Sequence, residues 1–134
     1  MAKPFTVQDF MSANLISLPH DMEILEAARI LAEKRISSAP VVDHTGHLVG
    51  VLAEQDCLRA VFRACYHEEW GGRVAEYMEP GARRIEAETS IADVAMQWMD
   101  SNDFRGFTVT KEGRLMGQFS IRDALKAFEA LSHS

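Results

Sequence analysis

The sequence predicts an α+β fold made of two β-α-β-β-α repeats that pack with pseudo-twofold symmetry. The main observation is an internal repeat, because the stretch from Gly50 to Asp56 is echoed by the stretch from Gly117 to Asp123, 67 residues later. In both places an apolar, strand-like run ends in a helix-like run that carries an acid near its start. A repeat of this length indicates one supersecondary unit used twice.

The first repeat should contain a short helical turn, a strand, a long helix, a hairpin and a closing helix. Asp21 is the expected N-cap of the long helix. A polar loop that ends in Gly46 separates two apolar runs, which predicts the hairpin. The long helix should bury one face, because its apolar residues follow helical spacing at Ile24, Ala27, Ala28, Leu31 and Ala32. The other expected elements are 5–13, 15–18, 39–42, 47–52 and 54–66.

The second repeat should follow the same order at the same offset. Thr89 or Ser90 is the expected N-cap of its long helix. The buried face of that helix is expected at Ile91, Val94, Ala95, Trp98 and Met99. The other expected elements are 74–78, 84–86, 106–110, 114–119 and 120–131. Gly71 and Gly72 mark the linker, so we expect a first repeat at 6–66, a linker at 67–73 and a second repeat at 74–131.

Composition excludes several classes of protein. An apolar content of 47% in 134 residues is that of a folded chain rather than a disordered one. A net charge of −6 argues against binding to nucleic acid or to an anionic membrane. The chain starts Met1-Ala2-Lys3-Pro4 without a signal-peptide pattern, and no apolar run is long enough for a membrane span. With only Cys57 and Cys65 and no CxxC motif, we expect a cytoplasmic protein with reduced thiols.

The order of elements and the repeated motif resemble the cystathionine β-synthase (CBS) domain, and two copies resemble the CBS pair called a Bateman module. The resemblance covers about residues 6–129. It implies a non-catalytic regulatory module that binds an adenosine-containing ligand such as AMP, ADP, ATP or S-adenosylmethionine between the repeats, with no other cofactor. It also implies a homodimer that regulates another protein, whose identity is not encoded. The markers of the resemblance are 7–11, 39–43, 46–50 and 53–56 in the first copy, and 74–78, 113–117 and 120–123 in the second.

The resemblance assigns ligand contacts to the second copy of the motif. The family's motif aspartate, here Asp123, holds ribose hydroxyls, and its Ser/Thr hydroxyl, here Ser120, contacts phosphate. A carboxylate suits a vicinal diol, since hydrogen bonds to charged groups are worth about 1.5–3 kcal/mol. The start of the helix would also favour phosphate, and Arg122 would add a positive charge. Ile85, Phe107 and Thr108 are the positional candidates for the adenine wall.

The first copy departs from this pattern. Ala53 stands where Ser120 stands in the second copy, so no hydroxyl is available there, although Asp56 is kept to hold ribose. We expect the Asp123 site to be the better nucleotide site. The second copy departs as well, because Thr108 replaces the proline found as Pro40, which leaves the ligand's identity open.

Other interpretations remain open. Ser120 and Asp123 also match a capping box, and both roles can coexist. The whole chain could be a structural dimerisation module with degenerate sites. An enzyme is disfavoured, since the sequence has no catalytic triad order and no P-loop. No metal site is predicted, because the nearby histidines lie in a hairpin loop (His44 and His47). Trp98 is expected in the core, and Tyr66 and Trp70 on an exposed contact surface.

Overall fold

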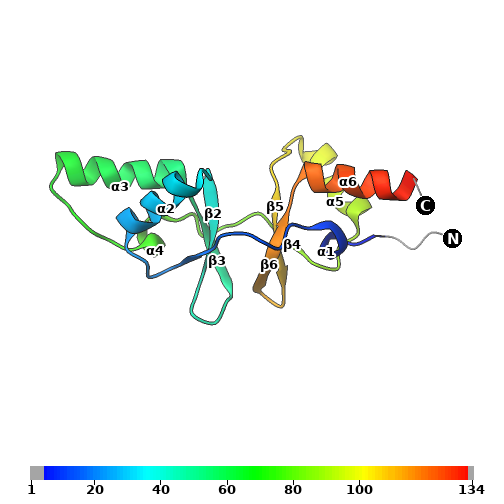
Figure 1. The fold of residues 1–134 in the computed structure, drawn as a ribbon, viewed down its shortest axis with the longest axis horizontal. Coiled ribbons are helices and arrows are strands. Elements are labelled where there is room, and N and C mark those ends of the chain that lie inside the picture. Colours follow the sequence, from blue (N-terminus) through cyan, green and yellow to red (C-terminus); the bar gives the residue numbers. More distant parts are fainter. Residues whose placement is uncertain (1–4, 133–134) are drawn as a thin grey trace. The chain divides into compact units, whose positions relative to one another are not determined.

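The computed structural model describes residues 5–132 and confirms the α+β class with two repeated sets of elements (Figure 1). The first four residues, on which the absence of a signal peptide was argued, lie outside the described range. The elements are α1 (Val7–Phe10), β1 (Leu18–Pro19), α2 (Ile24–Lys34), β2 (Ser38–Val42), β3 (Leu48–Ala53), α3 (Glu54–Tyr66), α4 (Val74–Tyr77), β4 (Arg84–Glu86), α5 (Ile91–Ser101), β5 (Phe107–Lys111), β6 (Arg114–Phe119) and α6 (Ile121–Ser132).

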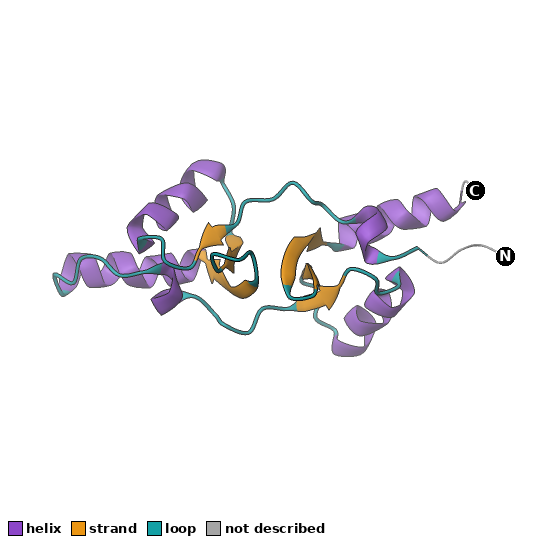
Figure 2. Ribbon diagram, turned by 90° about the horizontal axis from the view of Figure 1, so that it is seen from below, coloured by secondary structure: helices purple, strands orange, loops and turns teal. Residues whose placement is uncertain are grey.

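The chain forms two compact units, each with one three-stranded sheet. The middle unit comprises residues 16–82, and the terminal unit comprises the residues up to 15 together with those from 83 onward. The strand order is β1-β2-β3 in the middle unit and β4-β5-β6 in the terminal unit, and in both sheets the first pair is parallel and the second antiparallel. In each unit the long helices lie on one side of the sheet (Figure 2).

The units exchange their leading helices relative to the sequence repeats. The first helix, α1, contacts α6 and β6 of the second repeat, and α4 contacts α2, α3 and β3 of the first repeat. Val7 is fully buried in the core of the terminal unit, and Val74 in the core of the middle unit. The sequence repeats and the packing units are therefore different divisions of the same chain.

Each unit has its own apolar core between its sheet and its helices. In the middle unit the expected helical face contributes Ile24, Ala27 and Leu31. In the terminal unit Trp98 is 3% exposed, which confirms its place in the core, where its ring stacks on Phe119. The two cores consist mainly of Leu18, Ile24, Leu31, Val41, Leu52 and Val74 in one unit, and of Val7, Ile85, Val94, Trp98, Phe107, Val109 and Phe119 in the other.

The helix starts differ in part from expectation. Ser90 caps α5 by accepting a hydrogen bond from the Asp93 amide, which decides between the two candidates. The expected N-cap Asp21 is wrong, because Glu23 caps α2 and accepts from two amides of the first turn. The backbone around Glu23 pairs with the segment at Arg73, and this pairing keeps it extended up to the first helical residue. A distant pairing thus sets the start of this helix.

Two glycines allow the exchanged segments to approach the sheets. Gly117 lies beside Met11 and Ser12, where an added Cβ would come within 2.6 Å of the Ser12 carbonyl oxygen. At Gly50 the corresponding Cβ would lie 2.7 Å from the Glu79 carbonyl oxygen. Next to each glycine the backbones exchange two hydrogen bonds of 2.8–2.9 Å, between Ser12 and Gln118 in one unit, and of 2.9 Å between Glu79 and Val51 in the other. The repeated glycines are therefore a packing requirement.

We expect Gly117→Ala to lower the free energy of unfolding by about 1–3 kcal/mol, since the new methyl group overpacks a backbone contact. Urea denaturation measures this change. Gly81→Ala is the matched control, because a Cβ at Gly81 would have no heavy atom within 4 Å. Equal denaturation midpoints for the two variants would contradict the close approach at Gly117.

Candidate functional site

Asp123 lies at the start of α6, where its carboxylate closes a capping box with Ser120. Its Oδ2 accepts hydrogen bonds from the Ser120 amide at 2.9 Å and the Ser120 hydroxyl at 3.1 Å. The Ser120 Oγ in turn accepts from the Asp123 amide at 3.3 Å. The side chain of Asp123 is buried, with 5% of its residue surface exposed. The capping interpretation of this pair is therefore confirmed, and any ligand contact would come in addition to it.

The second carboxylate oxygen of Asp123 is less committed. Its Oδ1 accepts a single long contact of 3.4 Å from the hydroxyl of Ser12, which the exchanged N-terminal segment brings to this site. A hydrogen bond of that length is at the limit of useful geometry. This oxygen is thus the one best placed to accept a bond from another hydroxyl group.

A row of polar residues crosses the sheet of the terminal unit beside Asp123. Arg84 pairs with Thr108, Thr108 with Gln118, and Gln118 with Ser12. Residues paired in register point to the same face of a sheet. On that face Thr110 donates a 2.7 Å hydrogen bond to Glu86, which shows that the face is polar beyond this row. Sequence reasoning missed Ser12, Arg84 and Gln118, because only strand register brings them together.

Two predicted adenine contacts lie on the other face. Ile85 and Phe107 are both 6% exposed and belong to the apolar core of the terminal unit. The Phe107 ring packs against Trp98 and lies under the guanidinium of Arg83, 4.4 Å from its centre. Thr108 is also 6% exposed but faces the polar side, and its amide donates to the Arg83 carbonyl at 2.7 Å. Of the three wall candidates, only Thr108 shares the face of the polar row.

The start of α6 is suited to an anion. The first amides of a helix have no acceptor within the helix, and here these include Ile121 and Arg122. The helix dipole adds partial positive charge at the same end. Arg122 itself is exposed in the first turn and makes no hydrogen bond or ion pair with the described residues. The acid in this turn, Asp123, is turned back into the capping box.

The corresponding position in the middle unit is closed in three ways. Both oxygens of Asp56 are occupied, Oδ2 by the Ala53 amide at 2.8 Å and Oδ1 by Arg59 at 2.7 Å. The first-turn amide of Glu54 donates to the Ser37 carbonyl at 2.9 Å. Glu54 also places a negative charge where α6 has Ile121. Asp56 is therefore an internal ion-pair partner, and the electrostatics of this helix start disfavour phosphate.

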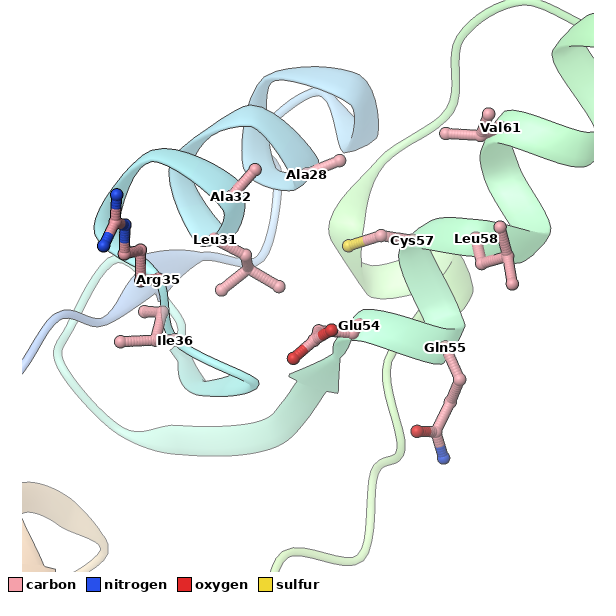
Figure 3. A pocket seen from close by; sticks show the side chains of 10 residues that line it. All are labelled: Ala28, Leu31, Ala32, Arg35, Ile36, Glu54, Gln55, Cys57, Leu58 and Val61. Atoms are coloured by element: carbon pink, nitrogen blue, oxygen red, sulfur yellow. The ribbon is translucent and has the colours of Figure 1, made fainter.

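The largest groove among those found lies elsewhere, between α2 and α3 of the middle unit. It encloses about 760 Å³ and is lined largely by apolar side chains (Figure 3). None of the predicted ligand residues lines it. Burial raises the pKa of the Cys57 thiol in its wall, and the neighbouring carboxylates of Asp56 and Glu54 raise it further. The thiol is therefore poorly reactive at neutral pH.

The hairpin loop with the histidines forms a hydrogen-bonded turn. Asp43 accepts bonds from the Thr45 hydroxyl and from the amides of His47 and Thr45, which together lower its pKa to about 2. Within residues 5–132 no group of three or more His, Cys, Asp or Glu side chains is arranged to hold a metal ion. Over the same range no helix has both the length and the apolar character needed to cross a bilayer.

The family comparison agrees with this geometry. A sequence model described as "CBS domain" matches residues 7–63 and again residues 74–130. The chain belongs to the CBS-domain family. The two matches make it a tandem CBS pair, in which each matched segment carries one copy of the Gly-to-Asp motif. CBS pairs are regulatory modules, so the chain groups with regulatory proteins and not with enzymes.

The relatives and solved structures include other CBS pairs. The uncharacterized protein MJ1225 of Methanocaldococcus jannaschii is 30% identical over 124 residues, which is 90% of this chain but only 41% of that protein. CBSX2 in complex with AMP is similar with a TM-score of 0.76 and 25% identity, over 96% of this chain and 98% of that one. The CBS pair of protein MJ0100 in complex with 5′-methylthioadenosine and S-adenosyl-L-methionine has a TM-score of 0.67 and 25% identity, over 96% and 98%.

We expect Ser120→Ala to lower the free energy of unfolding by about 1 kcal/mol even without a ligand, since it removes the cap of α6. Ala53→Ser at the equivalent position of α3 should raise it by up to about the same amount, because it supplies the missing hydroxyl. Chemical denaturation of both variants measures the two changes. If neither change shifts the denaturation midpoint, the hydroxyl does not stabilise these helix starts.

Proposed function

We propose that this CBS pair is a non-catalytic sensor that binds an adenosine-containing ligand through Asp123. The observation that carries the proposal is the difference between the two motif aspartates. Both oxygens of Asp56 have short bonds to the Ala53 amide and Arg59, whereas Asp123 Oδ1 has only the 3.4 Å contact with Ser12. That oxygen can accept a ribose hydroxyl without breaking the cap. The crystallised complexes of CBSX2 with AMP and of the MJ0100 pair with adenosine derivatives support this ligand class.

The phosphate of such a ligand would lie near the start of α6. The amides of Ile121 and Arg122 and the Arg122 guanidinium are the donors that its charge would meet. The Ser120 hydroxyl has one proton, which it gives to Asp123, so contact with phosphate requires that proton to turn away from the carboxylate. Thr108 and the polar row beside it would face the rest of the ligand.

Regulation would follow from a population shift. A ligand that binds one arrangement of the pair more tightly than another favours that arrangement by its difference in affinity. The partner that reads this change is a separate protein or a further part of a longer chain, as in MJ1225, which is more than twice as long as the matched segment. We further propose that the pair acts in the cytoplasm as a homodimer, since exposed apolar side chains are concentrated on its long helices.

A purely structural role is the second candidate. It is favoured by the capping box at Asp123, whose hydrogen bonds are complete without any ligand. Ala53 and the ion pair between Asp56 and Arg59 favour the same interpretation for the other copy. In that case the module would serve only to join chains, and adenosine compounds would leave its stability unchanged.

Ligand-dependent melting separates the two candidates. AMP, ATP or S-adenosylmethionine at about 100 times its dissociation constant should add about 2.7 kcal/mol to the stability. We expect Asp123→Asn to abolish the increase in melting temperature, whereas the matched variant Asp56→Asn should keep it relative to its own baseline. An unchanged melting temperature with every compound would support the structural role.

The number of sites provides an independent measurement. Isothermal titration with the compound that stabilises the protein should give one strong site per chain, because only α6 has first-turn amides available and no acidic residue in the position of Glu54. Ile121→Glu should weaken binding, since it copies that charge into the proposed phosphate site. Two equal, phosphate-dependent sites per chain would contradict the proposed asymmetry.

A further inference from the structure

The two long helices of each unit present surfaces of opposite relief. In the middle unit the helices α2 and α3 enclose the groove of about 760 Å³ (Figure 3). Ala28 and Ala32 of α2 line it on one side, and Leu58 and Val61 of α3 on the other. The hollow exists because small side chains occupy α2 where two helices diverge. We call this surface the α2–α3 groove.

The equivalent helices of the terminal unit carry larger side chains at the same repeat positions. With the offset of 67 residues, Met99 replaces Ala32 and Phe128 replaces Val61. These side chains point outward, with 71% of Met99 and 68% of Phe128 exposed. Met96 and Leu125 beside them are more than half exposed as well. We call this surface the α5–α6 ridge, and its exposure corrects the sequence-based placement of Met99 in a buried helical face.

Apolar side chains on both surfaces are open to solvent. Leu58 and Phe62 at the groove are 67% and 52% exposed. Contiguous apolar surface of this kind marks an interaction site more often than a free surface. Because both surfaces lie on the same chain, a second copy brings a ridge for every groove.

The charges on the two surfaces also differ in sign. Around the groove, basic residues outnumber acidic ones by five to four, and around the ridge, acidic residues outnumber basic ones by four to two. Opposite net charge favours contact between the groove and the ridge over contact between two like surfaces. The residues counted are Arg29, Lys34, Arg35, Arg59, Arg63, Glu26, Glu33, Glu54 and Asp56 at the groove, and Asp93, Asp100, Asp123, Glu129, Arg122 and Lys126 at the ridge.

We propose that two copies of this chain associate head to tail, with the α5–α6 ridge of one copy seated in the α2–α3 groove of the other. Met99 and Phe128 fill the hollow beside Ala28 and Ala32. A groove against a groove would leave that hollow unfilled, and a ridge against a ridge would crowd Met99 against its own copy. The inference rests on the self-association proposed above and adds which surfaces meet.

Disulfide cross-linking tests the pairing directly. Two single variants, Ala32→Cys and Met99→Cys, are made in a Cys65→Ser background, and one carries a mass tag. Cys57 stays in place because it is buried and poorly reactive. After subunit exchange and mild oxidation, we expect the tagged and untagged chains to cross-link with each other and each variant alone to cross-link weakly. Strong cross-linking of each variant with itself, or a dimer with no cross-link, would overturn the head-to-tail pairing.

A charge variant supplies a second readout that does not depend on the cysteines. Met99→Glu should shift the protein from dimer to monomer in sedimentation velocity at micromolar concentration, because it places a carboxylate in an apolar contact. The matched control Gln97→Glu, exposed on the same helix, should stay dimeric. A wild-type chain that is monomeric would overturn the proposal and point to another protein as the occupant. The melting response to nucleotide, measured on the same variants, reports separately on ligand binding.

Discussion

The structure depends on one repeated backbone contact between each sheet and a segment from far along the chain. Ser12 and Gln118 exchange two hydrogen bonds, and Glu79 and Val51 do the same in the other unit. These contacts need the bare backbones of Gly117 and Gly50, because a side chain there would collide with the opposing carbonyl. The conspicuous glycines of the repeat thus have a steric cause, and the aspartates six residues later lie in helices that follow directly from these strands.

The candidate site is a product of that contact. Ser12 reaches Asp123 only because the N-terminal segment packs on β6. The middle unit has Glu79 in the corresponding segment, and there the motif aspartate is paired with Arg59 instead. Duplicated backbones therefore present two different chemical environments, one suited to a diol and an anion and the other closed by its own side chains.

Local pattern predicted much of the fold. The range of α3, the strand Arg84–Glu86 and the core position of Trp98 followed from helical spacing, alternation and the repeat offset. The capping box of Ser120 and Asp123 was also predictable, since all its atoms lie within one turn. Strand register could not be predicted, and so the opposite faces of Phe107 and Thr108 and the contribution of Gln118 were missed. The outward position of Met99 was missed because helical spacing does not say which of two neighbouring apolar stripes is covered.

The exchange of leading helices could not be predicted either, because the offset of 67 residues is the same whichever sheet each helix joins. It has a bearing on how such a chain could arise. A polypeptide with a single copy would have an empty place on its last strand and a helix with nowhere to pack. Two such polypeptides would complete each other by trading helices, so an ancestor of one repeat would be a swapped dimer, and gene fusion would turn that trade into the present single chain.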